Sequence, residues 1–215
     1  MFLLIDTSTR NASLAICTSG EFVNKQTWSS QYNHSQELFV ALEKAFLETK
    51  LTISDITAIG LALGPGGYSS VRSGVSVGKT IAYAQNIPIF GHNTLDLEAA
   101  VHQPQRMKIC SVIEAGKSVL SYAVYDPSGE RLGPDKVSDI ESILDELDDQ
   151  TLICGEGVKT YENSIKTTSI QMAVWDSQIP RLEALGAKTL EKHTTGNASK
   201  LEDIEPIYAR PPSIG

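Results

Sequence analysis

Apolar residues alternate with polar residues over the first 30 positions and are interrupted by short polar turns, a pattern typical of β-strands. Three strands are predicted, at Phe2–Ile5, Ala12–Thr18 and Glu21–Trp28. Ser19-Gly20 supplies the turn between the second and third. The pattern therefore predicts an antiparallel meander at the start of the chain.

The pattern then changes from a period of two to the period of a helix. Asn33 followed by Gln36 fits a capping box, in which each side chain bonds the other residue's backbone. Leu38 and Leu42 mark one apolar face of the helix that follows. We expect this helix to run from His34 to about Thr49.

Residues 64–84, GPGGYSSVRSGVSVGKTIAYA, form the most distinctive stretch. A predicted strand, Ile56–Leu63, ends at a turn of three glycines and a proline. Beyond the turn Ser69 or Ser70 is the predicted N-cap of a long helix. The sequence Gly78-Lys79-Thr80 resembles the end of a P-loop, but it lies deep in this helix and lacks the preceding glycine at the required spacing.

The same helix has a ridge of very small residues that recur every four positions: Ser70, Gly74, Gly78 and Ala82. Each interior glycine destabilises a helix by about 1 kcal/mol relative to alanine. Another backbone packing closely against the ridge would offset that cost. The partner is either another part of this chain or a second subunit, and the ridge alone does not decide between them.

The second half of the chain repeats the order of elements in the first. The segments LLIDTSTRNASLAICTSGE and SVIEAGKSVLSYAVYDPSGE share strand, acid, polar turn, strand and a final SGE. We predict two lobes of one β-β-β-α-β-α plan, at residues 1–103 and 104–215. The final helix, Pro180–His193, and the tail are able to pack back on the first lobe. This duplicated α/β layout resembles the actin, sugar-kinase and Hsp70 superfamily. The remaining predicted elements are strands at Ile87–Gly91, Met107–Ile113, Ser118–Tyr125, Thr151–Cys154 and Met172–Trp175, and helices at Thr94–Val101 and Ser138–Leu147.

Composition narrows the class of protein. Hydrophobic residues make up 41% of the 215 residues and charged residues 20%, as in ordinary globular proteins. The formal net charge is −8, from 18 Lys and Arg against 26 Asp and Glu. That balance argues against a protein that binds nucleic acid alone. The N-terminus does not fit a signal peptide, and three widely spaced cysteines predict reduced core thiols, so we expect a cytoplasmic protein.

Residues for catalysis or metal binding are sparse. The four histidines, His34, His92, His102 and His193, form no HxxxH or HExxH pair, so we expect no metal site. We also expect no catalytic residues and no cofactor. Asp6, at the end of the first strand, is the one candidate for holding a nucleotide phosphate through a metal ion. The hairpin that follows it, however, lacks the glycines that let phosphate approach a backbone.

Several motifs resemble the bacterial TsaB (YeaZ) family. They are IDTST near the start, NHSQEL at the first helix, GPGGYSSVRSGVSVGKTIA, IEAGKSVLSYAVYD, CGEGV and the closing EPIYARP. This family contributes a subunit to the machinery that makes N6-threonylcarbamoyladenosine at position 37 of tRNA. The resemblance covers the whole chain and implies an actin-like fold. One departure is Glu114-Ala115-Gly116, where the family usually has Asp-Ala-Arg.

The resemblance also implies partners. These are TsaD, a catalytic paralogue that forms a heterodimer with TsaB, and the ATPase TsaE. It further implies a homodimer when the protein is alone, and contact with tRNA only through the complex. TsaD has a metal-binding NHxxxH segment, whose two histidine positions correspond here to Thr94 and Glu98. Pairing would use the first two helices, and the expected interface is His34, Leu38, Leu42, Ser70, Gly74, Gly78 and Ala82.

The leading hypothesis is therefore a non-catalytic scaffold subunit. It would support TsaD in transferring threonylcarbamoyl from threonylcarbamoyl-AMP to N6 of adenosine-37. Two alternatives remain open, an ATP-dependent small-molecule kinase or a metal-dependent peptidase of the same superfamily.

Overall fold

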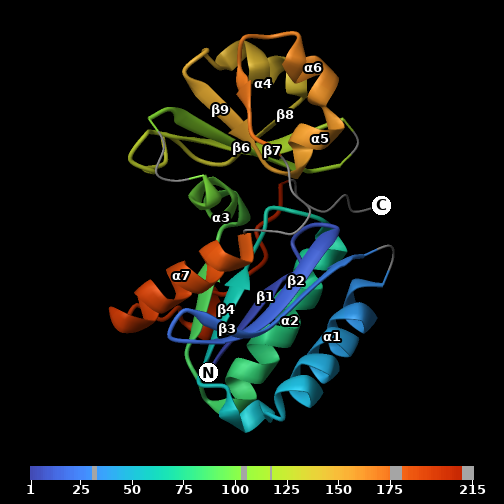
Figure 1. Ribbon diagram of the computed structural model, residues 1–215, viewed down its shortest axis with the longest axis vertical. Helices are drawn as coiled ribbons and strands as arrows, with labels where there is room; N and C mark the ends of the chain where they lie inside the picture. Colours follow the sequence, from blue (N-terminus) through green and yellow to red (C-terminus); the bar gives the residue numbers. More distant parts are fainter. Residues whose placement is uncertain (31–32, 103–105, 117, 175–180, 210–215) are drawn as a thin grey trace.

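The structure is a computed structural model that describes residues 1–30, 33–102, 106–116, 118–174 and 181–209. It contains two five-stranded sheets, one in each half of the chain, with helix α3 (Thr94–Val101) lying between them (Figure 1). Residues 103–105, where the sequence places the join between two lobes, lie outside the described residues.

The first sheet has the spatial order β3-β2-β1-β4-β5. β1 pairs antiparallel with β2 and parallel with β4, so the predicted meander leads into a parallel edge. β1 and β4 are buried along their whole length, in keeping with their continuous apolar sequences. The strands are β1 (Phe2–Asp6), β2 (Asn11–Thr18), β3 (Glu21–Ser29), β4 (Ala58–Ala62) and β5 (Ile89–His92).

The second sheet repeats this plan, with the order β10-β9-β6-β7-β8. β6 takes the place of β1, since it pairs antiparallel with β7 and parallel with β9. The duplicated α/β plan is thus confirmed. The three-residue edge strand β8 was not predicted. The strands are β6 (Lys108–Glu114), β7 (Leu120–Tyr125), β8 (Lys136–Ser138), β9 (Thr151–Cys154) and β10 (Gln171–Met172).

Helices cover both sheets. α1 (His34–Thr49) and α2 (Tyr68–Gln85) pack on one face of the first sheet, and α7 (Arg181–Thr194) packs on the other. The second sheet carries α4 (Ile140–Glu146), α5 (Glu156–Thr160) and α6 (Glu162–Lys166) on one face and α3 on the other. α5 and α6 were not predicted. The final helix therefore belongs to the layer that covers the first sheet, and Pro180 lies outside the described residues.

The glycine turn joins β4 directly to α2. Gly64 has φ +97°, and a Cβ there would lie 2.4 Å from the carbonyl oxygen of Ile207, so glycine is required on both counts. The N-cap is Gly67, not Ser69 or Ser70 as predicted. Ser70 lies in the first helical turn, where its hydroxyl donates to the carbonyl of Gly67.

Within the described residues no helix combines the length and the apolar character needed to cross a membrane. The three cysteines, Cys17, Cys110 and Cys154, are free and buried.

Candidate functional site

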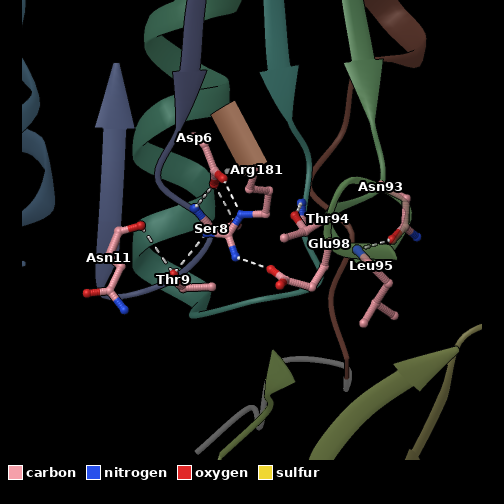
Figure 2. A network of polar contacts seen from close by, with 10 residues as sticks. Asp6, Ser8, Thr9, Asn11, Asn93, Thr94, Leu95, Glu98 and Arg181 are labelled. Atoms are coloured by element: carbon pink, nitrogen blue, oxygen red, sulfur yellow. Dashed lines mark hydrogen bonds and ion pairs between the residues drawn. The ribbon is translucent and has the colours of Figure 1, made fainter. Parts of the chain in front are cut away.

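Asp6 is the last residue of β1, at the end of the first sheet that lies toward the second sheet, and is fully buried (Figure 2). One of its carboxylate oxygens accepts hydrogen bonds from the backbone and hydroxyl of Ser8, at 2.9 and 2.5 Å. The other accepts from the guanidinium of Arg181, at 2.6 Å. Both oxygens of the only predicted nucleotide-binding residue are thus occupied by the chain itself.

Arg181 is the centre of this cluster (Figure 2). Its guanidinium also donates to Glu98 on α3, at 3.1 Å, and to the hydroxyl of Thr9, at 3.1 Å. The side chain is 5% exposed. Burial opposes its charge, but the carboxylates of Asp6, Glu98 and Glu156 raise the pKa of Arg181, which therefore stays cationic. We call these interacting residues the cleft network.

The cleft network has an excess of acidic groups. Besides Asp6 and Glu98, the carboxyl of Glu156 lies near Arg181. Burial raises the pKa of Glu156 to about 7, Arg181 opposes that shift, and Glu114 and Glu98 add to it. Three carboxyl groups surround one guanidinium. Glu156 is only partly ionised at neutral pH, so Asp6 and Glu98 supply most of the excess negative charge around Arg181. The field of these groups therefore disfavours a bare phosphate and favours a cation.

The hydroxyls after β1 are also used internally. The Thr7 hydroxyl donates to the carbonyl of Ser70, at 2.6 Å, and accepts from the backbone N–H of Gly74, at 3.1 Å. Ser8 and Thr9 bond Asp6 and Arg181. This segment fixes α2 and α7 against β1.

Arg181 was missed by sequence reasoning. It is separated from Asp6 by 175 positions, and no motif marks it. The sequence offers only a weak indication of its role, a single arginine in the first turn of an amphipathic helix. Arginines at such positions are common on protein surfaces and do not by themselves indicate a buried ion pair.

The small-residue ridge of α2 faces the chain's own sheet, and its predicted role as a docking face is corrected. Ser70 and Ala82 are 3% and 2% exposed. A Cβ on Gly74 would lie 2.4 Å from the Thr7 hydroxyl, and one on Gly78 would lie 2.5 Å from the Leu61 side chain. The groups that pack against the glycines are side chains of the first sheet and of Thr7, just beyond β1, so the alternative of an internal contact is the right one.

The three predicted interface residues of α1 are also mostly turned inward. Leu38 is fully buried and Leu42 is 7% exposed, because both pack in the core beneath the helix. His34 is half-buried at the helix start, and burial lowers its pKa. Asn33 caps the helix as predicted, accepting from the backbone of Gln36.

The outer face of α1 and α2 carries large exposed apolar side chains among polar and charged ones such as Glu43 and Lys44. On α1, Phe39 is 59%, Val40 58% and Leu47 71% exposed, and on α2 Tyr83 is 78% exposed. A groove of about 510 Å³ runs between the two helices. No acidic residue lines it. The lining residues are Ser35, Phe39, Leu42, Arg72, Ser73, Ser76, Val77, Thr80 and Ile81.

Thr94 and Glu98, which the resemblance to TsaD suggests as counterparts of two metal-binding histidines, are hydrogen-bonded to other parts of this chain. The Thr94 hydroxyl accepts from the backbone of Gly64, at 3.0 Å, and Glu98 pairs with Arg181. Glu114, in the departing Glu-Ala-Gly segment, accepts from Thr160 on α5 at 2.5 Å.

Three potential metal ligands meet beside the cleft network. They are Glu98, His102 and Cys154, whose ligand atoms all lie within 4.8 Å of one another. The sequence contains no HxxxH or HExxH pair, and Cys154 comes from a distant part of the chain, so the pattern of histidines does not indicate them. The available signal was Glu98 and His102 at a spacing of four, which puts both on one face of a helix.

The chain has recognisable relatives. A family model described as TsaD, tRNA N6-adenosine threonylcarbamoyltransferase, matches residues 23–189. The tRNA threonylcarbamoyladenosine biosynthesis protein TsaB of Escherichia coli (strain K12) is 22% identical over 217 residues, covering 97% of this chain and 94% of that protein. A tRNA N6-adenosine threonylcarbamoyltransferase of Clostridium kluyveri is 28% identical over 141 residues, covering 56% of this chain and 41% of the transferase.

Among solved structures, a Pseudomonas aeruginosa protein described as similar to the peptidase YeaZ has the same fold. Its TM-score is 0.79 at 22% identity, over 97% of this chain and 99% of that one. The family model covers well over half of the chain, and several TsaB proteins are similar to the chain in sequence. The chain therefore belongs to the TsaD family of sequences and, within it, to the TsaB (YeaZ) group.

Proposed function

We propose that this protein acts in the biosynthesis of tRNA threonylcarbamoyladenosine as a non-catalytic subunit. It docks on a TsaD-type transferase, which carries out the transfer of threonylcarbamoyl from threonylcarbamoyl-AMP to N6 of adenosine-37. The names of its relatives support the pathway. The observation that carries the docking role is the uncovered apolar face of α1 and α2.

This face has the properties of a protein interface. Phe39 and Leu47 are large apolar side chains that water surrounds in the monomer. The groove beside Phe39 has a volume of about 510 Å³, which leaves room for side chains of a partner helix. Apart from Arg72, its polar lining residues carry hydroxyl groups, which lose little on burial when they can bond locally. Ser73 and Thr80 already donate to carbonyls of their own helix, at 3.0 and 2.8 Å.

A family member that carries the transferase name is a suitable partner. A transferase of this kind is 28% identical to this chain over 141 residues, and we infer that a TsaD-type partner has counterparts of α1 and α2. Two helix pairs of similar shape pack into a four-helix bundle, with the two subunits related by a pseudo-two-fold axis. We further propose that the same face forms a homodimer when the partner is absent, that a TsaE-type ATPase joins the heterodimer, and that tRNA is bound only by the assembled complex.

The cleft network supports the non-catalytic part of the proposal. Arg181 occupies the carboxylate of Asp6, and the carboxyl groups of Glu98 and Glu156 lie near the same guanidinium. A kinase would have to break this buried pair in order to use Asp6. We therefore favour the scaffold role over the kinase alternative.

The direct test is light scattering after size-exclusion chromatography of the full chain mixed with the TsaD-type paralogue from the same organism. We expect a heterodimer that Phe39→Asp weakens at least tenfold, because the substitution places a charge in the apolar contact. The matched control is Leu132→Asp in the second half of the chain, where Leu132 is 57% exposed and thus as accessible as Phe39.

Pairing that survives Phe39→Asp unchanged would exclude this face as the interface. Loss of pairing in both variants would point to a general effect of added negative charge. A nucleotide titration of the isolated chain by calorimetry completes the test, since tight ATP binding would revive the kinase alternative.

A further inference from the structure

Glu98, His102 and Cys154 are brought together by two elements from different halves of the fold. Glu98 lies on α3 and His102 caps its C-terminal end, one helical turn further on. Cys154 is the last residue of β9 in the second sheet. Its side chain lies on the face of that sheet that α3 covers, in a cluster with Leu95 and Ala99. The packing of α3 on the second sheet is thus what assembles the three side chains.

The spacing of the ligand atoms fits one small cation. Zinc binds sulfur at about 2.3 Å and imidazole nitrogen or carboxylate oxygen at about 2.0–2.2 Å. Those bond lengths put neighbouring ligand atoms of a tetrahedral site roughly 3.3–3.8 Å apart. The three atoms here lie within 4.8 Å of one another, so an inward movement of about 1 Å or less completes the contact.

The ligands are available for a metal. Within the described part of the chain, no hydrogen bond is made by the imidazole of His102 or by the thiol of Cys154. Glu98 uses its Oε2 atom to accept from Arg181, which leaves Oε1 free. An arginine that holds one oxygen of a ligating carboxylate fixes the direction of the other, as outer groups do in established metal sites.

The charge around the three side chains also favours a cation. Glu98 is 13% exposed and His102 is half-buried, so an ion can reach these two from solvent, while Cys154 is fully buried. The excess of carboxyl groups in the cleft network lies next to them. A thiolate and an imidazole exclude Mg²⁺ and Ca²⁺ as the natural ligand, because those ions prefer oxygen.

We propose that Glu98, His102 and Cys154 form a binding site for one Zn²⁺ ion, or a divalent ion of the same class, between α3 and the second sheet. The Cys154 thiol loses its proton to water as the sulfur–metal bond forms. Three protein ligands leave a fourth position for water or an incoming group. The ion links α3 to β9 and, through Glu98 and Arg181, to β1 and α7, so it ties the two halves of the molecule together.

The test uses the full chain without an affinity tag, stripped of metal with a chelator and titrated with Co²⁺ and with Zn²⁺. Co²⁺ replaces Zn²⁺ in tetrahedral sites and absorbs visible light there, and a bound thiolate adds a charge-transfer band in the near ultraviolet. We expect one equivalent of Co²⁺ to produce both signals, Zn²⁺ to displace it, and Zn²⁺ to raise the melting temperature.

Cys154→Ala and His102→Ala should each weaken Zn²⁺ binding at least tenfold, and Cys154→Ala should abolish the thiolate band. The matched control is Cys110→Ala. Cys110 is equally buried but packs on the opposite face of the second sheet, under α4 and α5, so its removal should leave metal binding intact.

A cobalt spectrum of the unmodified chain without a thiolate band would overturn the proposal, whatever the variants do. So would equal Zn²⁺ affinity in Cys154→Ala and Cys110→Ala. Circular dichroism of each variant establishes that it is folded. The outcome is independent of pairing with a TsaD-type partner, since these ligands lie away from the outer face of α1 and α2.

Discussion

The cleft network and the outer face of α1 and α2 differ in how far their side chains are buried and bonded by the chain itself. In the cleft, the carboxylate of Asp6 is buried, and this chain supplies every bond to it. On the outer face, Phe39 and Leu47 remain exposed although they are strongly apolar. Asp6 draws attention first, because it is the one residue for which the sequence suggested a role in nucleotide binding. The exposed apolar side chains lie on the outer face of α1 and α2, and they are the better indicator of where another molecule binds.

The largest effect is expected from removing the cation of the cleft network. Arg181→Ala leaves the Asp6 carboxylate buried without a counter-charge and should lower the free energy of unfolding by about 3–5 kcal/mol. Lys25→Ala is the control, because Lys25 pairs with Glu183 of the same helix at the surface, where a pair contributes about 1 kcal/mol or less. Urea denaturation measures both. Equal effects would show that the cleft pair is not specially important to the fold.

The next largest effect is a difference in stability between substitutions on the buried and on the exposed side of α2. Gly74→Leu forces a side chain against Thr7 and Ile5, so we expect a loss of about 3 kcal/mol or a failure to fold. The gain in helix propensity, about 1 kcal/mol, is too small to offset it. Ser76→Leu on the exposed side of the same helix should change stability by about 0.5 kcal/mol or less. A stable, well-folded Gly74→Leu protein would contradict the inward orientation of the ridge.

Acid should lower the stability of the fold by protonating His92, a second buried polar group that α7 covers. His92 is 6% exposed, its Nε2 lies 3.2 Å from the hydroxyl of Thr189, and burial lowers its pKa to about 3, with Lys192 and Lys188 adding to the shift. The unfolded chain binds a proton below about pH 6.5, whereas the folded chain does not do so until about pH 3. This contribution to stability is therefore complete above pH 6.5 and is lost as the pH falls.

At pH 5 the loss should be about 2 kcal/mol, from 1.36 kcal/mol for each pH unit. Denaturation of the unmodified protein and of His92→Gln at pH 7 and pH 5 measures it. The variant should lack this part of the pH dependence. An unchanged slope in His92→Gln would assign the acid sensitivity to other groups.

The smallest effect is expected on the outer face. Phe39→Ala should alter the stability of the isolated chain by about 0.5 kcal/mol or less, because Phe39 makes few contacts within it. Its neighbour Leu38 is fully buried, and Leu38→Ala should cost about 2–5 kcal/mol. Thermal or urea unfolding of the two variants gives the comparison. A large loss in Phe39→Ala would mean that the face serves the monomer's own fold.

Elements whose signal is local were predictable from the sequence. α3 was predicted at its observed bounds, Thr94–Val101, and Asn33 caps α1 as predicted. The Gln36 side chain, however, accepts from the Asn33 side chain and not from its backbone, so only one half of the predicted capping box is seen. The repeated order of strands gave the duplicated plan. Short elements such as β8 carry too few residues for a pattern.

The composition of the sites required three-dimensional contacts. Glycines at a spacing of four show that something packs closely on α2, but they do not say whether it is a sheet of the same chain or another protein. Arg181 meets Asp6, and Cys154 meets Glu98, only because α7 and α3 pack as they do. Such pairings depend on the whole fold and leave no mark on local sequence spacing.

The return of α7 to the first sheet has a consequence for synthesis on the ribosome. The strands of the first sheet emerge early, but the helix that covers Leu4 and Phe90 and neutralises Asp6 is made 175 positions later. At roughly 5–20 residues per second, that interval is about 10–35 s. The nascent first sheet therefore waits with one apolar face uncovered and a charge without its partner, and it becomes complete only after nearly the whole chain has been translated.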